Sequence, residues 1–353
     1  MAAHLFKSLA LGALELTNRI VMAPMTRNRA EPDGSPNELM ARHYARRATA
    51  GLIVAEGSWP TVTGQAYCRQ PGIETSAQIA GWRRVTDAVH SEGGLIVLQL
   101  MHAGRIGSRH IKPIGVETIG PSVLQARGQI WTDSAGMQPH DVPREMRADD
   151  VRTAVQQHRQ AACNARDAGF DGVELHGTSG YLSMQFLYSG TNRRTDRYGG
   201  SAANRARFTL ECLESMASAI GADRVGLRIN PGNTYNDATD EGSAATHAEL
   251  MRQSSQLGLA YLHVMRAPTA DIDAFGLARR HFRGPLILND GFDGFSAEAA
   301  LSAGQGEAVS FARSFIANPD LVRRLRDGLP LAKFDRRSLY TPGPAGYNDY
   351  PDA

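Results

Sequence analysis

Residues 173–181 are Val173-Glu174-Leu175-His176-Gly177-Thr178-Ser179-Gly180-Tyr181. A short apolar run, typical of a buried strand, ends at His176, and a turn bracketed by glycines then presents Ser179 and Tyr181. Three side chains that can hydrogen-bond or move a proton therefore cluster where a strand gives way to a loop. On a parallel α/β scaffold, chemistry is usually placed at that end of a strand. The segment predicts an enzyme built on a parallel sheet.

Similar short apolar runs recur along the chain and alternate with amphipathic stretches. The runs are Ile20–Ala23, Leu52–Ala55, Leu95–Leu100, Gly172–Leu175, Val225–Ile229, Tyr261–Met265, Leu286–Leu288 and Ala308–Phe311. The stretches with helical periodicity are Gln78–Ser91, Asp149–Ala168, Asn204–Ile220, Ala244–Leu257 and Ala297–Ala303. Strands that are apolar almost throughout are buried on both faces, and repeated strand–helix alternation favours a closed barrel over an open sheet. We predict an α/β fold in which residues 1–353 form a single (β/α)8 TIM barrel.

Three segments fall outside the strand–helix repeat. The alternation at Leu14–Thr17 indicates a strand, and we expect an N-terminal β-hairpin there. Residues 101–148 after the third strand are rich in Gly, Pro and Ser, and a connection of that length is usually functional, so we expect a capping insertion over the barrel mouth. The tail from Tyr340 contains several prolines and glycines, and we expect its tyrosines to pack back on the barrel.

Composition excludes several classes of partner and cofactor. The formal net charge of +2 is spread along the chain, which argues against nucleic acid and anionic membranes. No apolar run approaches the ~20 residues of a membrane helix, and the N-terminus lacks the basic lead-in and cleavage site of a signal peptide. Cys68, Cys163 and Cys212 are far apart. We expect a cytoplasmic protein with free thiols and no metal.

The ends of the strands carry polar residues that a barrel would bring to one mouth. They include Thr26, Gln99, His176, Arg228 and Arg313. Small residues beside an arginine at the last two strands suit a phosphate group, because they admit it to backbone N–H groups. The sequence has no G-x-G-x-x-G motif for a Rossmann nucleotide site and no G-x-S-x-G motif of a serine hydrolase.

Thr26, Gln99 and His176 lie in motifs that resemble those of the Old Yellow Enzyme family of FMN-dependent ene-reductases. The similar segments are Asn18–Arg27, Ala50–Gly57, Gln99–Arg105, Ala168–His176, Arg193–Gly200, Asn204–Arg207, Phe315–Leu321 and Gly346–Pro351. Each motif is weak alone, but eight in the right order along nearly the whole chain are specific. The resemblance implies one FMN-binding TIM barrel that reduces activated alkenes.

The resemblance also implies roles for individual residues. Thr26 would hydrogen-bond the flavin beside N5, Gln99 its pyrimidine edge, Arg228 the N1 side and Arg313 the FMN phosphate. Cofactor contacts are further implied for Pro24, Met25, Gly57, Asp290, Gly291 and Ala312. His176 and Ser179 would hold the substrate carbonyl, and Tyr67, Met101 and Tyr340 would line the substrate space. Hydride would pass from flavin N5 to the β-carbon, and Tyr181 would protonate the α-carbon.

The same resemblance implies the partners of the reaction. NADPH, or NADH, would reduce the flavin by binding to its substrate face and leaving, which predicts ping-pong kinetics. The second substrate would be a small activated alkene such as an enone, enal, maleimide or nitroalkene. Members of the family occur as monomers and as homodimers, and the sequence does not choose between them.

Three positions depart from the family pattern. Ser179 stands where the family has Asn or a second His, Asp290 where it usually has Gly, and Ala312 where it has Gly. A hydroxyl donates only one hydrogen bond, and a carboxylate beside a phosphate is unfavourable unless it turns away. Two alternatives therefore stay open: an FMN-dependent biosynthetic isomerase or desaturase acting on one natural product, and a barrel that has lost its flavin. A purely structural interpretation also stays open for single residues: His176 and Tyr181 as packing residues, and Arg228 and Arg313 as ion-pair partners.

Overall fold

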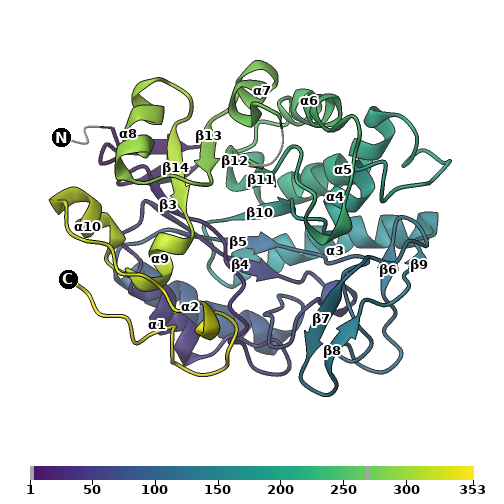
Figure 1. The fold of residues 1–353 in the computed structure, drawn as a ribbon, viewed down its shortest axis with the longest axis horizontal. Helices are drawn as coiled ribbons and strands as arrows, with labels where there is room; N and C mark the ends of the chain where they lie inside the picture. Colours follow the sequence, from purple (N-terminus) through teal and green to yellow (C-terminus); the bar gives the residue numbers. More distant parts are fainter. Residues whose placement is uncertain (1–3, 268–270) are drawn as a thin grey trace.

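Eight parallel strands close into a barrel in the computed structural model, which describes residues 4–267 and 271–353. In the order in which they pair, the strands are β10 (Gly172–Gly177), β11 (Val225–Ile229), β12 (Tyr261–Met265), β13 (Leu286–Asn289), β14 (Ala308–Phe311), β3 (Ile20–Met22), β4 (Leu52–Ser58) and β5 (Ile96–Leu100). All eight predicted strands are therefore confirmed. Nearly every residue in them is buried, because the helices cover the outside of the barrel and side chains fill its inside (Figure 1).

Helices follow the strands and surround the barrel (Figure 1). They are α1 (Glu38–Ala45), α2 (Ser76–Ser91), α3 (Ala148–Asp167), α4 (Leu182–Leu187), α5 (Ala202–Ile220), α6 (Ser243–Ser254), α7 (Ala274–His281), α8 (Gly294–Ser302), α9 (Arg313–Ala317) and α10 (Leu321–Asp327). Short 3-10 turns are η1 (Val62–Gly64), η2 (Ala222–Arg224), η3 (Tyr235–Asp237) and η4 (Arg336–Ser338). The five predicted helices are α2, α3, α5, α6 and α8. The capping box of Thr75 and Gln78 shows why α2 begins where it does.

The predicted N-terminal hairpin is present as β1 (Leu9–Leu11) and β2 (Leu14–Leu16), which pair antiparallel. Its turn approaches Asp223 just before β11, where Ala13 donates a backbone hydrogen bond of 2.9 Å. A side chain at Gly12 would lie 2.3 Å from the Asp223 carbonyl oxygen, and its φ of +59° suits glycine. The hairpin thus packs at the amino ends of the strands and leaves the carboxyl ends free.

The segment between β5 and α3, predicted to be a capping insertion at 101–148, carries small elements of its own. These are β6 (Ile119–Gly120) paired with β9 (Arg144–Glu145), and the hairpin β7 (Gln129–Thr132) with β8 (Gly136–Pro139). Asp133 at the hairpin turn forms an ion pair with Arg69 in the loop after β4. This ion pair holds the hairpin beside the loops at the carboxyl ends of the strands (Figure 1).

The C-terminal segment packs back on the barrel, as expected for its tyrosines. Tyr347 is fully buried and its ring stacks on His43, with 3.8 Å between centroids. The guanidinium groups of Arg27 and Arg29 lie over the other face of Tyr347, at 5.2 and 4.8 Å from its centroid. Both arginines also donate to backbone carbonyls of this segment. Tyr340 is 60 % exposed and stays at the barrel mouth.

Two kinds of feature are absent from the residues that the structure describes. None of their helices is both long enough and apolar enough to cross a membrane. Within these ranges, no three His, Cys, Asp or Glu side chains come together in a group suited to a metal ion.

Candidate active site

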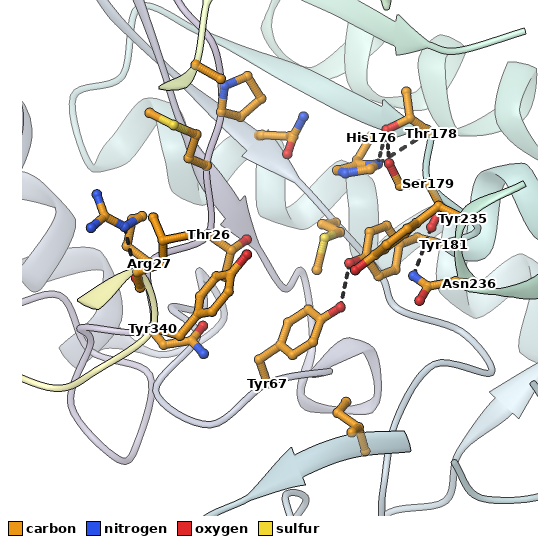
Figure 2. A pocket seen from close by; sticks show the side chains of 18 of the residues that line it. Thr26, Arg27, Tyr67, His176, Thr178, Ser179, Tyr181, Tyr235, Asn236 and Tyr340 are labelled. Carbon is orange, nitrogen blue, oxygen red and sulfur yellow. Dashed lines mark hydrogen bonds between the residues drawn. The ribbon is translucent and has the colours of Figure 1, made fainter. Parts of the chain in front are cut away.

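A cavity of about 690 Å³ opens at the carboxyl ends of the barrel strands, a size typical of ligand sites. All but three of the predicted site residues line it: Pro24, Met25, Thr26, Tyr67, Gln99, Met101, His176, Ser179, Tyr181, Arg228, Ala312, Arg313 and Tyr340. They come from strands or loops far apart in the sequence, and Figure 2 shows several of them around one space. The closed barrel brings them together because all eight parallel strands end at the same mouth.

The three remaining residues lie next to this lining. Gly57 is at an irregularity in the pairing of β4 with β5, and a side chain there would lie 2.9 Å from the sulfur of Met101. Asp290 is at the rim, with its carboxylate 3.8 Å from the guanidinium of Arg313. Gly291 follows it with a φ of +75°.

His176 is held as a neutral hydrogen-bond donor. Its Nδ1 accepts a 3.3 Å hydrogen bond from the backbone N–H of Thr178, so in the neutral ring the proton is on Nε2. Burial, together with the positive charge of Arg228, lowers the pKa of His176 to about 3. The imidazole is therefore uncharged at neutral pH and can donate through Nε2 but cannot serve as a general acid.

Ser179 adopts a backbone conformation that is uncommon for serine. Its φ is +56°, and its carbonyl oxygen accepts a 2.9 Å hydrogen bond from the side-chain amide of Asn236. Its hydroxyl donates to the hydroxyl oxygen of Thr178 at 3.2 Å. The single donor of Ser179 is thus engaged by a neighbour, and His176 is the stronger donor toward the cavity.

Tyr181 caps the start of α4 and lies between His176 and Tyr67 (Figure 2). Its ring meets that of His176 edge to face, with 4.9 Å between centroids. Its hydroxyl is 2.7 Å from the hydroxyl of Tyr67. Burial raises the pKa of Tyr181 well above its ordinary value, so the phenol remains protonated at neutral pH.

A buried polar chain lies under the Gln99 side of the cavity. Gln99 Nε2 donates to Glu174 at 2.8 Å, which leaves the amide oxygen of Gln99 free to accept. The other oxygen of Glu174 is 2.8 Å from His263 Nδ1, and His263 Nε2 is 2.7 Å from the hydroxyl of Ser310. Burial would raise the pKa of Glu174, but His263, Arg228 and Gln99 outweigh it and hold the pKa below its ordinary value.

Sequence reasoning assigned no role to Glu174 or His263. The sequence does contain an indication for Glu174. Residues two apart on a strand face the same side of the sheet, and Glu174 precedes His176 by two. His263 lies in the middle of β12, away from the strand end, where no sequence motif marks it.

The opposite end of the cavity is exposed and basic. The side chain of Arg313 is 66 % exposed, and its charged neighbour is Asp290. Asp290 has a φ of +90°, which side chains rarely tolerate and glycine adopts freely. Its carbonyl oxygen accepts a 2.7 Å hydrogen bond from Arg266, whose guanidinium lies 4.9 Å from the ring centroid of Phe292. Arg266 was also missed, although it directly follows the last residue of β12.

The cavity has further lining residues that the sequence analysis did not name: Arg27, Asn28, Gln129, Ile130, Trp131, His140, Thr178, Tyr235, Asn236, Ile316, Phe334, Arg336 and Leu339. Most belong to loops, to the β7–β8 hairpin or to the C-terminal segment. Their place in the fold follows from long-range contacts, such as the hydrogen bonds of Arg105 to the carbonyls of Asn236 and Asp237. No local pattern marks such residues in the sequence.

Arg228 is buried and lines this space. Its NH2 group donates to Asn289 at 2.7 Å, whereas its Nε has no hydrogen-bond partner among the described residues. A buried N–H without a partner is costly, and a ligand acceptor would satisfy it.

Comparisons with known proteins agree with this geometry. Residues 4–332 match the NADH:flavin oxidoreductase / NADH oxidase family. The chain is 40 % identical over 355 residues to a probable flavin mononucleotide-dependent alkene reductase of Leishmania infantum, covering 98 % of this chain and 97 % of that protein. It is 38 % identical over 351 residues to 12-oxophytodienoate reductase 1 of Oryza sativa subsp. japonica, covering 97 % and 91 %.

Solved structures give the same result. A morphinone reductase in complex with tetrahydroNAD superposes with a TM-score of 0.95 at 42 % identity, covering 99 % of this chain and 97 % of that one. An old yellow enzyme homologue from Zymomonas mobilis superposes with a TM-score of 0.95 at 37 % identity, covering 98 % and 99 %. The chain therefore belongs to the NADH:flavin oxidoreductase family, that of Old Yellow Enzyme, and is an FMN-dependent oxidoreductase of the ene-reductase type.

Proposed function

We propose that this oxidoreductase uses NADPH to reduce the C=C bond of α,β-unsaturated carbonyl compounds and related activated alkenes. The observation that carries the proposal is a neutral His176 beside a protonated Tyr181 at one end of the cavity. The first group can hold and polarise a carbonyl oxygen, while the second can deliver a proton to carbon.

The residues around the cavity fit FMN. Arg228 lines the cavity and supplies a fixed positive charge, and Gln99 offers a free amide oxygen. Gly57 has no room for a side chain next to Met101, which keeps this wall flat. Arg313 lines the exposed end, and Arg266 donates to the carbonyl oxygen of the adjacent Asp290, so both would supply positive charge for the phosphate. Bound and reduced, FMN supplies the hydride for the β-carbon.

The chain's own residues then act on the alkene. His176 donates Nε2–H to the carbonyl oxygen, and Ser179, with its hydroxyl engaged by Thr178, adds less. Tyr181 gives its phenolic proton to the α-carbon, and its raised pKa keeps that proton available at neutral pH. Thr26 and Arg228 line the same cavity. They would contact the flavin, so they would affect its reduction rather than the substrate.

Tyr67, Met101 and Tyr340 form the walls of the substrate space. We propose that NADPH enters the same space, donates its hydride and leaves before the alkene binds. The morphinone reductase relative in complex with tetrahydroNAD supports a nicotinamide compound as the reductant. Ping-pong kinetics follow, because one space serves both substrates in turn.

Anaerobic mixing of the NADPH-reduced holoenzyme with cyclohexenone, N-ethylmaleimide and a nitroalkene tests the proposal. We expect the yellow oxidised flavin spectrum to return and one equivalent of saturated product to form for each NADPH consumed. If none of these acceptors reoxidises the enzyme, the proposal is wrong.

The isomerase or desaturase alternative makes a different prediction. An isomerase converts its substrate without net consumption of NADPH, so product formation in the absence of reductant would favour it. Reduction that strictly follows NADPH consumption would exclude it. NADH compared with NADPH in the same assay gives the reductant preference.

A further inference from the structure

Two phenols meet at the substrate end of the cavity (Figure 2). The hydroxyl oxygens of Tyr67 and Tyr181 are 2.7 Å apart, a short hydrogen bond in which either can be the donor. His176, Tyr181 and Tyr67 thus lie in a row, with Tyr181 in the middle. Tyr181 is buried, whereas Tyr67 is only partly buried and stands nearer to water.

The loop that carries Tyr67 is built to hold it in place. The side-chain oxygen of Gln70, a fully buried residue, accepts from the backbone N–H groups of Ala66 at 3.0 Å and Tyr67 at 3.3 Å. The side-chain nitrogen of Gln70 donates to the carbonyl of Gly57 at 2.8 Å. Gln70 therefore ties the backbone of Tyr67 to the end of β4, so the contact between the two phenols does not depend on a free loop.

Donation of a proton by Tyr181 would leave a phenolate in a buried site. Its hydroxyl is hydrogen-bonded to that of Tyr67, and the side chain of Asn236 favours the charged form of Tyr181 and so lowers its pKa. An unpaired buried charge is expensive, so the phenolate needs a donor at once. Burial raises the pKa of both phenols. Because Tyr67 is the less buried of the two, it can pass its proton to the Tyr181 oxygen across the 2.7 Å contact and regain one from water.

We propose that Tyr67 and Tyr181 form a two-phenol proton relay to the substrate carbon. The O–H bond of Tyr181 breaks as the C–H bond forms at the α-carbon, and the proton of Tyr67 then moves to the Tyr181 oxygen. Water at the open side of the cavity returns a proton to Tyr67. The relay consumes one proton for each alkene and moves no electrons. It rests on the proposed function, because it needs an alkene protonated at this site.

A nitroalkene separates the relay from hydride transfer, because the nitro group stabilises the carbanion until it is protonated. NADPH-reduced holoenzyme is mixed anaerobically with nitrocyclohexene, and nitroalkene consumption and nitronate decay are followed separately by absorbance. The variants are Tyr67→Phe, Tyr181→Phe and, as a matched control, Tyr198→Phe. Tyr198 lies outside the cavity, and its hydroxyl donates to Glu211 at 2.9 Å. The flavin spectrum and melting temperature of each variant report folding.

We expect Tyr67→Phe to slow nitronate protonation about 10-fold more than it slows nitrocyclohexene consumption. Imidazolium buffer should recover much of that loss by delivering the missing proton, and a purely structural role for Tyr67 would not respond to it. Tyr198→Phe should match the wild type in both steps.

Two results would overturn the relay: nitronate decay in Tyr67→Phe at the wild-type rate, or equal slowing of consumption and decay that imidazolium does not relieve. Failure of the proposed function has a different signature. The wild-type enzyme itself would then consume no nitrocyclohexene and form no nitronate.

Discussion

The two ends of the cavity are built differently, although one barrel mouth holds both. At the substrate end, Tyr181 is buried and His176 is partly buried, and each is hydrogen-bonded to or packed against a partner that sets its protonation state or orientation. At the phosphate end, Arg313 is largely exposed and Asp290 has strained backbone geometry. The substrate end is organised before any ligand arrives, whereas the phosphate end keeps a competing anion beside its arginine.

The difference shows where sequence changes are tolerated. A buried, connected site loses several interactions when one member changes, because each group sets the state of the next. An exposed ion pair contributes little, typically about 0–1 kcal/mol. For this reason, we expect Asp290 to compete only weakly with the FMN phosphate that we propose for Arg313. We therefore expect large effects from changes at the substrate end and small ones at the phosphate end.

The largest effect should follow loss of the proton donor. Tyr181→Phe keeps the ring against His176 and should slow reoxidation of the reduced enzyme by cyclohexenone by about 10²–10⁴-fold. Reduction of the flavin by NADPH, measured separately by stopped flow, should change little. Equal slowing of both half-reactions would show that Tyr181 supports the fold of the site rather than protonation.

The second largest effect should be on stability, because acid should destabilise the fold through His176. The pKa of His176 is about 3 in the fold, whereas an exposed histidine titrates near 6.5, so the unfolded chain binds more protons between these values. Stability contributed by neutral His176 is complete above pH ~6.5 and is lost as the pH falls toward 3, by at most about 1.4 kcal/mol per pH unit. Thermal unfolding from pH 7 to pH 4 should show a shallower decline for His176→Gln than for the wild type.

Glu56 has the opposite influence on the pH dependence of stability, so its contribution must be distinguished from that of His176. Burial raises its pKa to about 7, so its folded carboxyl holds a proton that the unfolded chain releases above its ordinary value. Glu56 therefore stabilises the fold at low pH, and that contribution is lost as the pH rises through 7. An identical pH dependence in His176→Gln and the wild type would contradict the assignment of a neutral, buried imidazole.

A moderate gain is expected at Ser179. Ser179→Asn places a residue that tolerates positive φ at +56° and adds amide donors toward the cavity. We expect kcat/KM for cyclohexenone to rise by about 10-fold, less than the full value of an oxyanion donor. Ser179→Ala keeps the backbone strain and removes the hydroxyl, so it controls for geometry. A fall in activity with Asn would indicate that the smaller serine is required for the natural substrate.

The smallest effect belongs to the phosphate end. Asp290→Gly removes both the carboxylate and the backbone strain, and should tighten FMN binding to the apoprotein by about 5-fold while leaving riboflavin binding unchanged. Asp290→Ala removes the charge but keeps a side chain at φ +90°, so it should tighten FMN binding without the gain in melting temperature expected for Gly. If riboflavin, which lacks the phosphate, also binds about 5-fold more tightly, the substitution acts through the barrel and not through the phosphate.

The strands and the main helices were predictable because their patterns are local. Buried parallel strands leave short apolar runs and surface helices leave amphipathic ones, and all eight strands and five helices were found in this way. The strand-end residues Thr26, Gln99, His176 and Arg228 line the cavity because parallel strands share one direction. The function implied for them came from the motifs, and their individual roles stay predictions.

The sequence by itself determined the class of fold, the family and the residues gathered at the mouth of the barrel, because these follow from periodicity and motif order. Only the tertiary structure decided the state of those residues. The neutrality of His176, the orientation of Gln99 toward Glu174 and the contact between Tyr67 and Tyr181 depend on burial and on partners distant in sequence. Desolvation and hydrogen bonding act through space, and no local sequence pattern encodes them.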